Sequence, residues 1–187
     1  MHLRPRGRSI LTGVGLVVVA GLLAAPAAHA KTAKEIDAGA DAVLEQFTQK
    51  VKGSREFLRT AKGVLVFPGV IKAGIGIGGE YGEGALRIGG RTVAYYSLAA
   101  ASIGLQLGAQ KKDIIIVFLD SKALADFQAS TGWQVGVNGS VVLVDLGADA
   151  SIDSQKANKP IVGFVIGQKG LMYNLTLEGA KISKIAR

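Results

Sequence analysis

The stretch from Lys72 to Gly84 constrains the fold more than any other part of the sequence, because it is dominated by glycine. Three of its glycines, Gly74, Gly76 and Gly78, alternate with isoleucine. In a β-strand, this period of two places bare backbone on one face and branched side chains on the other. Glycine inside a strand commonly marks a bulge, a tight bend or the close approach of another segment. We therefore expect a strand that another segment approaches closely.

The same glycines also match the spacing of a dinucleotide-binding fingerprint, Gly74-x-Gly76-x-x-Gly79. That fingerprint ends a strand and opens a helix, and the helix N-terminus then binds the pyrophosphate. Here the residues that follow, Glu80 to Gly84, contain two more glycines and are a poor helix start. The spacing therefore indicates a segment of a sheet and not a nucleotide-binding turn.

Residues 1–30 are typical of an export signal. A basic segment with three arginines precedes an apolar run from Ile10 to Ala25. The small residues Ala28 and Ala30 then frame a site of the kind that a signal peptidase cleaves. An uncleaved membrane anchor is the alternative interpretation. We expect cleavage after Ala30 and export of the remaining domain, to the periplasm or out of the cell.

The mature chain, residues 31–187, is long enough for one domain with its own core. Without the three arginines of the leader, its formal net charge falls from +8 to +5. The sequence has no cysteine, and both histidines, His2 and His29, lie in the leader. This composition excludes catalytic triads, histidine bases and ordinary zinc sites. We expect a protein without a metal ion, a cofactor or enzymatic activity.

The order of the expected elements indicates an α+β fold. Apolar residues at steps of three and four predict an amphipathic helix from Lys34 to Val51, and a short second turn capped by Ser54 follows. From Gly63 onward, short strands follow one another without helical crossovers, and one short helix from Ser121 to Ala129 interrupts them. We therefore expect a mainly antiparallel, glycine-rich sheet, or a barrel-like fold, against which the N-terminal helix packs.

The expected strands are bounded by glycine, proline and polar turn residues. They are Val64–Phe67, Val70–Gly79, Gly84–Ile88, Thr92–Ser97, Ser102–Ala109, Asp113–Leu119, Gln134–Leu146, Pro160–Ile166 and Leu171–Leu177. Gly89 and Gly90 predict a two-residue hairpin turn, and residues 167–170 predict a second hairpin. The run from Asp113 to Leu119 is apolar without alternation, which predicts a central strand covered on both faces.

A cluster of cations follows the first predicted helix. Its members are Lys50, Lys52, Arg55, Arg59 and Lys62 (here called the basic cluster), and Glu56 is the one acid among them. Phe57 and Leu58 lie between these cations. A solvated helix end explains such a pattern, and so does a surface that binds anionic lipid and inserts its apolar residues. Lys72 is a further candidate for contact with an anionic headgroup.

Glu80 and Glu83 are the best-placed pair of carboxylates for acid–base chemistry. A glycosidase needs two carboxylates that flank one bond, whereas an odd spacing places the two on opposite faces of a strand. Hydrolysis of a glycan is therefore the weakest of the functions considered. Trp133 follows a helix break, where it either packs in the core or lines a pocket.

Several segments together resemble the SYLF domain. They are Ala61-Lys-Gly-Val-Leu-Val-Phe-Pro68, the glycine run from Lys72 to Gly79, Gly82-Glu-Gly84, Tyr96-Ser97, Gly104-Leu-Gln-Leu-Gly-Ala-Gln110 and Lys169-Gly170. The resemblance covers roughly Ala33 to Ile185. It implies a domain that binds phosphoinositide membranes in eukaryotic endocytic adaptors and, in some members, actin. Bacterial members look like exported single-domain proteins.

This chain differs from the adaptors because it has a leader and no SH3 domain. We therefore expect residues 31–187 to form a SYLF-like domain that is exported and associates peripherally with anionic phospholipid surfaces, without binding nucleic acid. The expected lipid contacts are Lys50, Lys52, Arg55, Phe57, Leu58, Arg59, Lys62 and Lys72. The alternative is a soluble structural or protein-interaction module of the cell envelope.

Overall fold

A computed structural model of the chain describes residues 30–144, 152, 158–167, 177 and 179–187, with the backbone alone at residues 74–77 and 102–109. Lys31–Arg187 forms one compact unit, separate from Met1–Ala30. Among the helices in the described ranges, none is long and apolar enough to span a membrane. The predicted strand over 171–177 and the hairpin turn over 167–170 lie almost wholly outside the described residues.

A single long hairpin forms the centre of the fold. Strand β1 (Gly63–Ile88) pairs antiparallel with strand β2 (Arg91–Phe118). The predicted turn at Gly89 and Gly90 is confirmed, and both residues have the positive φ values (57° and 78°) that a two-residue hairpin favours. The prediction of separate short strands on either side of this turn was wrong, because the breaks are absorbed as register shifts inside two continuous strands.

Pro68 and Gly69 show how such a break is absorbed. The ladder shifts register between Phe67 and Val70, so the two residues form a bulge and do not end the strand. Gly69 has φ of +64°, and its backbone N–H donates to the Asp113 carboxylate at 2.7 Å. The side chain of a neighbouring strand therefore satisfies the backbone group that the bulge removes from the ladder.

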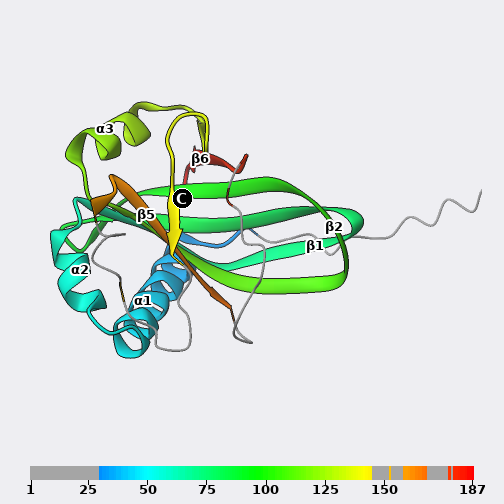
Figure 1. Cartoon of the computed structure of the whole chain (residues 1–187), viewed down its shortest axis with the longest axis horizontal. Helices are drawn as coiled ribbons and strands as arrows, with labels where there is room; N and C mark the ends of the chain where they lie inside the picture. Colours follow the sequence, from blue (N-terminus) through cyan, green and yellow to red (C-terminus); the bar gives the residue numbers. More distant parts are fainter. Residues whose placement is uncertain (1–29, 145–151, 153–157, 168–176, 178) are drawn as a thin grey trace, which may run out of the picture. The chain divides into compact units, whose positions relative to one another are not determined.

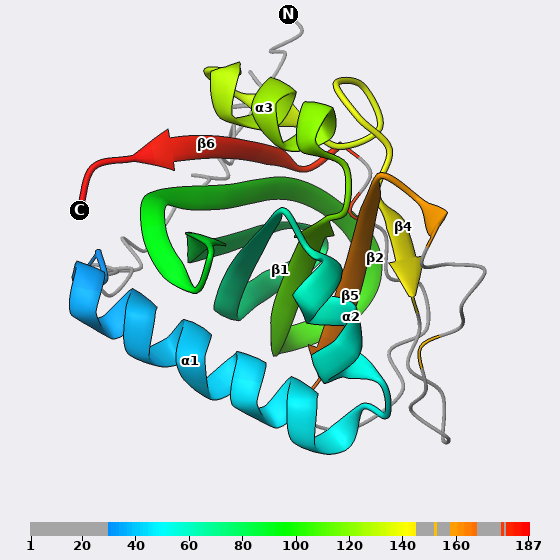
Figure 2. The same ribbon diagram turned by 90° about the vertical axis from the view of Figure 1, so that its left-hand side faces the viewer.

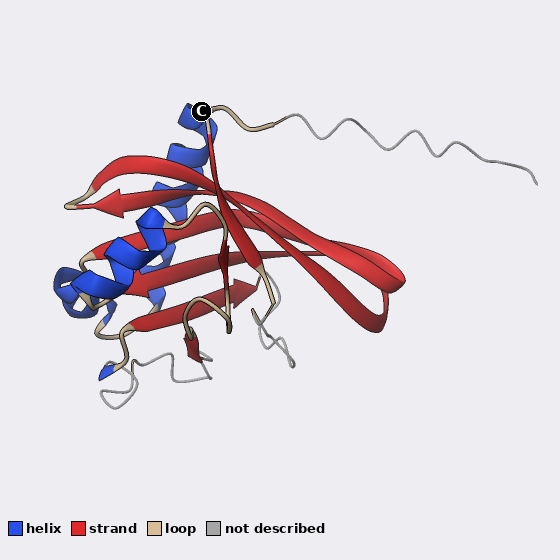
Figure 3. Ribbon diagram, turned by 90° about the horizontal axis from the view of Figure 1, so that it is seen from above, coloured by secondary structure: helices blue, strands red, loops and turns tan. Residues whose placement is uncertain are grey.

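The hairpin bends back on itself at the end farthest from the helices (Figures 1 and 3). The glycine run lies in this region, where Gly74 pairs with Gly108 and Gly76 with Gly104. Beyond the bend, the arm of β1 that contains Gly82 and Gly84 lies against the first arm. A Cβ added at Gly82 would lie 2.6 Å from Val70 Cγ2, and one at Gly84 would lie 2.3 Å from the Val66 carbonyl oxygen.

The run is thus a strand, as predicted, and the close approach is documented at Gly82 and Gly84. The close approach expected at Gly76 stays a prediction, because only the backbone is described at this position.

The remaining strands extend the hairpin into one curled sheet. They are β3 (Trp133–Gln134), β4 (Val142–Val144), β5 (Ile161–Gly167) and β6 (Lys181–Ile185). Strand β2 pairs with β6 over Tyr95–Ala99 and with β5 over Lys112–Phe118, which gives the order β3-β6-β2-β5-β4 with β1 on β2. The described pairs are antiparallel except β4 with β5. The α+β prediction is confirmed, although the predicted strand from Gln134 to Leu146 is two short pieces.

In the described ranges, three helices cover the two faces of this sheet, and Figure 2 shows their arrangement. Helix α1 (Ala33–Lys50) and helix α2 (Ser54–Thr60) lie on one face, and helix α3 (Ser121–Ala129) lies on the other. The α1 face buries Ile36, Phe47, Val66, Ile115, Val117 and Phe164, and the α3 face buries Leu65, Phe67, Ile114, Ile116, Phe118 and Phe127. Ile114 to Phe118 are all 0% exposed, which confirms that this segment is covered on both faces.

The helix caps follow local chemistry with two corrections. Thr32 and Glu35 form a capping box at the start of α1. The N-cap of α2 is Gly53 and not Ser54, whose hydroxyl instead donates to the carbonyl oxygen of Val51 at 2.6 Å. Ser121 was also expected to cap α3, but the N-cap is Asp120, whose carboxylate accepts from Ala123 N–H at 2.7 Å.

Candidate functional site

The basic cluster extends from the end of α1 through α2 to the start of β1. Its five cations are all exposed. Arg59 forms an ion pair with Glu56 at 3.2 Å, and both side chains are more than three-quarters exposed. With the carboxylates that the structure describes, the other four cations make no ion pair. Most of the positive charge of this surface is therefore available to an anionic partner.

The two apolar residues of the expected lipid site behave differently. Phe57 is buried, and its ring packs edge-on against Phe164 with the centroids 5.6 Å apart. Ser54 and Phe57 lie three residues apart on the face of α2 that meets the sheet. The aromatic ring therefore stabilises the attachment of α2 to the sheet and is not available for insertion into a bilayer. Leu58 is half-buried against the same core.

Lys72 does not join the basic cluster. It is half-buried on β1, opposite Gln110 of β2. A strand rises about 3.3 Å per residue, so β1 carries Lys72 away from α2 and toward the bend of the hairpin (Figure 1). The structure thus exposes five of the six predicted cations along the segment from the end of α1 to the start of β1 and places the sixth elsewhere.

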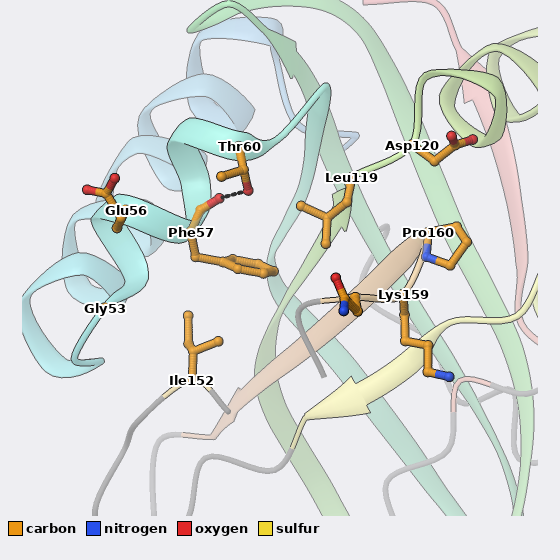
Figure 4. A pocket seen from close by; sticks show the side chains of 10 residues that line it. Gly53, Glu56, Phe57, Thr60, Leu119, Asp120, Ile152, Lys159 and Pro160 are labelled. Atoms are coloured by element: carbon orange, nitrogen blue, oxygen red, sulfur yellow. Dashed lines mark hydrogen bonds between the residues drawn. The ribbon is translucent and has the colours of Figure 1, made fainter. Parts of the chain in front are cut away.

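A groove lies beside α2. It has a volume of about 700 Å³, and the Phe57 ring and the Leu119 and Pro160 side chains form apolar walls (Figure 4). Among the described residues, its charged lining residues are Glu56, Asp120 and Lys159. Two acids against one base do not suit an anionic headgroup, so the groove is not the lipid contact that the sequence predicts.

Glu80 and Glu83 lie on opposite faces of β1, as their spacing predicted. Glu80 is 7% exposed, and its Oε1 lies 2.8 Å from Nζ of the equally buried Lys112. This Oε1 accepts no hydrogen bond of suitable geometry, so the contact is an ion pair without a directed hydrogen bond. This arrangement offers no pair of carboxylates around one glycosidic bond.

Glu83, on the α1 face of β1, is 4% exposed and accepts three donors. Its Oε2 accepts the main-chain N–H of Lys31 at 3.0 Å. Its Oε1 accepts the Tyr81 hydroxyl at 2.9 Å and pairs with the Arg187 guanidinium. Burial and the hydrogen bond to Glu83 raise the pKa of Tyr81.

A second network joins α1 to the hairpin, and no pattern in the sequence indicated it. Asp37 accepts the Thr92 hydroxyl at 2.7 Å and the Tyr95 hydroxyl at 2.8 Å. Arg87 contacts Asp41 at 2.9 Å and Asp37 at 3.6 Å. The hydrogen bond to Asp37 is the main reason that the pKa of Tyr95 is raised. Helix periodicity placed Asp37 on the polar side of α1, but its partners are fifty or more residues away in sequence.

Trp133 is 2% exposed and packs edge-on against Phe127, which agrees with the core interpretation. Among the residues that the structure describes, no group of histidine, cysteine, aspartate and glutamate side chains is suited to hold a metal ion.

Comparison with protein families gives one match. The Ysc84 family model, described as "Las17-binding protein actin regulator", matches residues 99–186. Residues 99–186 therefore match the SYLF (Ysc84) family. The resemblance predicted from the glycine-rich motifs is therefore confirmed. No curated protein matches the chain. The matched range begins inside β2, so α1, α2 and the basic cluster lie before it.

Proposed function

We propose that this SYLF protein is exported, is not an enzyme, and binds anionic phospholipid surfaces peripherally through the basic cluster. The observation that carries the proposal is the exposure of all five cations, of which Arg59 alone has a described carboxylate partner. Two of them, Arg55 and Arg59, are one helical turn apart on α2 and therefore project from the same side of that helix. A surface of this kind presents several positive charges at once to a negatively charged leaflet.

Electrostatic attraction supplies the affinity in this proposal. Each cation near an anionic leaflet contributes about 1 kcal/mol, so the cluster as a whole supplies a few kcal/mol. The contribution of apolar insertion is smaller than the sequence predicted, because Phe57 is buried and Leu58 is half-buried. Binding that depends mainly on charge weakens as salt rises, since the screening length falls from about 10 Å at 0.1 M to about 3 Å at 1 M.

Co-sedimentation with vesicles tests this proposal. The protein recovered after export is mixed with vesicles of neutral phosphatidylcholine alone, or of phosphatidylcholine with phosphatidylglycerol. The charge-reversed variant Lys52→Glu, Arg55→Glu, Arg59→Glu should lose at least about tenfold in affinity for the anionic vesicles, since each cation is worth about 1 kcal/mol. Sedimentation of the wild-type protein should require phosphatidylglycerol and should decline with added salt.

A matched control separates a specific surface from total charge. The variant Arg91→Glu, Lys181→Glu, Lys184→Glu changes the net charge by the same amount, and its three positions are exposed on β2 and β6. It should bind far better than the variant in the basic cluster. Equal losses in the two variants, or equal sedimentation of the wild type with neutral and anionic vesicles, would contradict the proposed site. The latter result would favour the alternative of a protein-interaction module.

A further inference from the structure

The start of α1 is fastened to the sheet by a main-chain contact. The backbone nitrogen of Lys31 donates to Glu83 Oε2 at 3.0 Å, and the Lys31 side-chain Nζ donates to the Pro68 carbonyl oxygen at 2.9 Å. The Arg187 guanidinium and the Tyr81 hydroxyl occupy the other oxygen of Glu83. Figure 2 shows the first turn of α1 on the same side of the sheet as the end of β6. Residues from three distant parts of the sequence thus meet at one buried carboxylate.

The neighbouring residue, Ala30, has a different environment. Ala30 is exposed, and it is the last residue of the unit that is separate from the compact domain. The peptide bond between Ala30 and Lys31 therefore coincides with the boundary between an exposed residue and a partly buried hydrogen-bond network. It also follows the small-x-small pattern of residues 28–30, which is typical of signal-peptidase cleavage sites.

We propose that the Ala30–Lys31 bond is a processing site and that Glu83 is the acceptor for the α-ammonium group that processing creates on Lys31. This inference rests on the export part of the proposed function but does not involve the basic cluster. Cleavage converts the contact that holds α1 from a neutral amide donor into a charged one, so the processed chain binds Glu83 more tightly than the precursor does.

The chemical step is the hydrolysis of one peptide bond by a signal peptidase. The C–N bond between the Ala30 carbonyl carbon and the Lys31 nitrogen breaks, and a C–O bond to the oxygen of water forms. Ala30 leaves as a carboxylate, and both protons of the water molecule end on the Lys31 nitrogen. The product at Lys31 is an ammonium group with three N–H donors in place of one.

The surroundings of Glu83 suit this product. A hydrogen bond between an ammonium and a carboxylate is shorter and roughly twice as strong as one between neutral groups. The buried Glu83 has one cationic partner, Arg187, among the described residues, so its Oε2 has capacity for a second. The charged groups around the Lys31 side chain are Glu83, Lys111, Asp113 and Glu35. Burial lowers the pKa of the Lys31 side chain, and the carboxylates of Glu83, Asp113 and Glu35 oppose this effect.

The first measurement needs only the wild-type full chain expressed in a host with an export pathway. The intact mass of the recovered protein should correspond to a chain that begins at Lys31. The α-amine should then react with an acylating reagent at neutral pH at least about tenfold more slowly in the native state than in urea, since each unit of raised pKa lowers the reactive fraction tenfold. A different first residue, or equal rates in the two states, would overturn the inference.

Two variants assign the effect to Glu83. Glu83→Gln keeps the size of the side chain and removes its charge, and it should raise the native acylation rate toward the rate in urea. Tyr81→Phe removes a different donor to the same carboxylate and should leave the α-amine protected. Protection that persists in Glu83→Gln would contradict the assignment. If Glu83→Gln does not fold, the wild-type comparison between native and unfolded protein still decides the inference.

The outcome is independent of lipid binding. All substitutions in this experiment leave the basic cluster intact, so a protein with an unprotected α-amine can still sediment with anionic vesicles. Conversely, a processed and protected N-terminus can occur in a protein that does not bind lipid at all.

Discussion

Strand β1 and helix α2 are consecutive in the sequence, yet their charged residues differ in burial and in ion pairing. On β1, the buried Glu80 and Glu83 and the half-buried Arg87 each have a partner of opposite charge. In the basic cluster, five cations are exposed and one has a described partner. The charges of β1 therefore contribute to holding the domain together, whereas those of the basic cluster contribute little to folding and are available for binding. Charge density along the sequence did not distinguish these cases, but burial and pairing do.

The largest expected effect is the removal of the partner of Glu80. Lys112→Ala leaves a carboxylate buried without a counter-charge, which typically costs about 3 to 5 kcal/mol in the free energy of unfolding. Denaturant unfolding monitored by circular dichroism measures this loss. The double variant Lys112→Met, Glu80→Gln removes both charges and should recover most of the stability. If Lys112→Ala lowers the free energy of unfolding by less than about 1 kcal/mol, water has access to the ion pair and the prediction is wrong.

A smaller effect is expected where β1 and β2 meet α1. Asp37→Asn removes the charge that accepts the Thr92 and Tyr95 hydroxyls and faces Arg87. Because Asp37 is about one-third exposed, we expect a loss of about 1 to 2 kcal/mol rather than the full value of a buried charged hydrogen bond. Thermal unfolding provides the measurement, and Asp126→Asn on the exposed surface of α3 is the matched control. Equal melting temperatures for the two variants would contradict the prediction.

The same contact predicts a dependence on pH. The folded-state pKa of Tyr95 is raised above the ordinary value of 10.0, mainly because its hydroxyl donates to Asp37. A raised pKa means that the stabilisation is complete below the unfolded value and is lost as the pH rises through the folded value. In Asp37→Asn, NMR titration of the tyrosine should show the pKa of Tyr95 falling back toward 10. An unchanged value in that variant would contradict the role given to the Asp37 hydrogen bond.

The smallest effect on folding is expected in the basic cluster. Arg59→Ala removes an exposed pair with Glu56, three residues earlier on α2, and should change the free energy of unfolding by less than about 0.5 kcal/mol. The same substitution should reduce binding to phosphatidylglycerol vesicles. A loss of stability as large as that of Asp37→Asn would place Arg59 among the structural charges and would remove the contrast between α2 and β1.

Much of the secondary structure could be predicted because local periodicity decides it. The amphipathic pattern identified α1 to within one residue at each end, and the Ser121–Ala129 helix was predicted with its observed bounds. The pair of glycines at 89 and 90 identified the hairpin turn, because few other residues adopt positive φ at both positions. The continuity of β1 through Pro68 was missed, since a bulge and a strand end look alike when the pairing strand is not known.

The candidate site was predicted only in part, for a related reason. The sequence identified the five cations and the opposite orientations of Glu80 and Glu83, because helix and strand periods determine which way a side chain points. It gave the wrong environment for Phe57, because the charged residues on either side of this aromatic suggested a surface position. Phe57 is buried because it packs against Phe164, which lies on β5, more than one hundred residues later in the chain.

The sequence by itself determined which segments are helix and which are strand, the family motifs, the absence of cysteine, and a charge cluster at the end of α1. Those properties depend on neighbours a few residues apart. Only the tertiary structure decided which charges are paired, because the partners of Asp37, Glu80 and Glu83 come from strands and chain ends thirty to one hundred residues away. Burial then fixes the consequence, since a charge inside the sheet must find a partner to avoid the cost of desolvation, whereas a charge on α2 is stabilised by water.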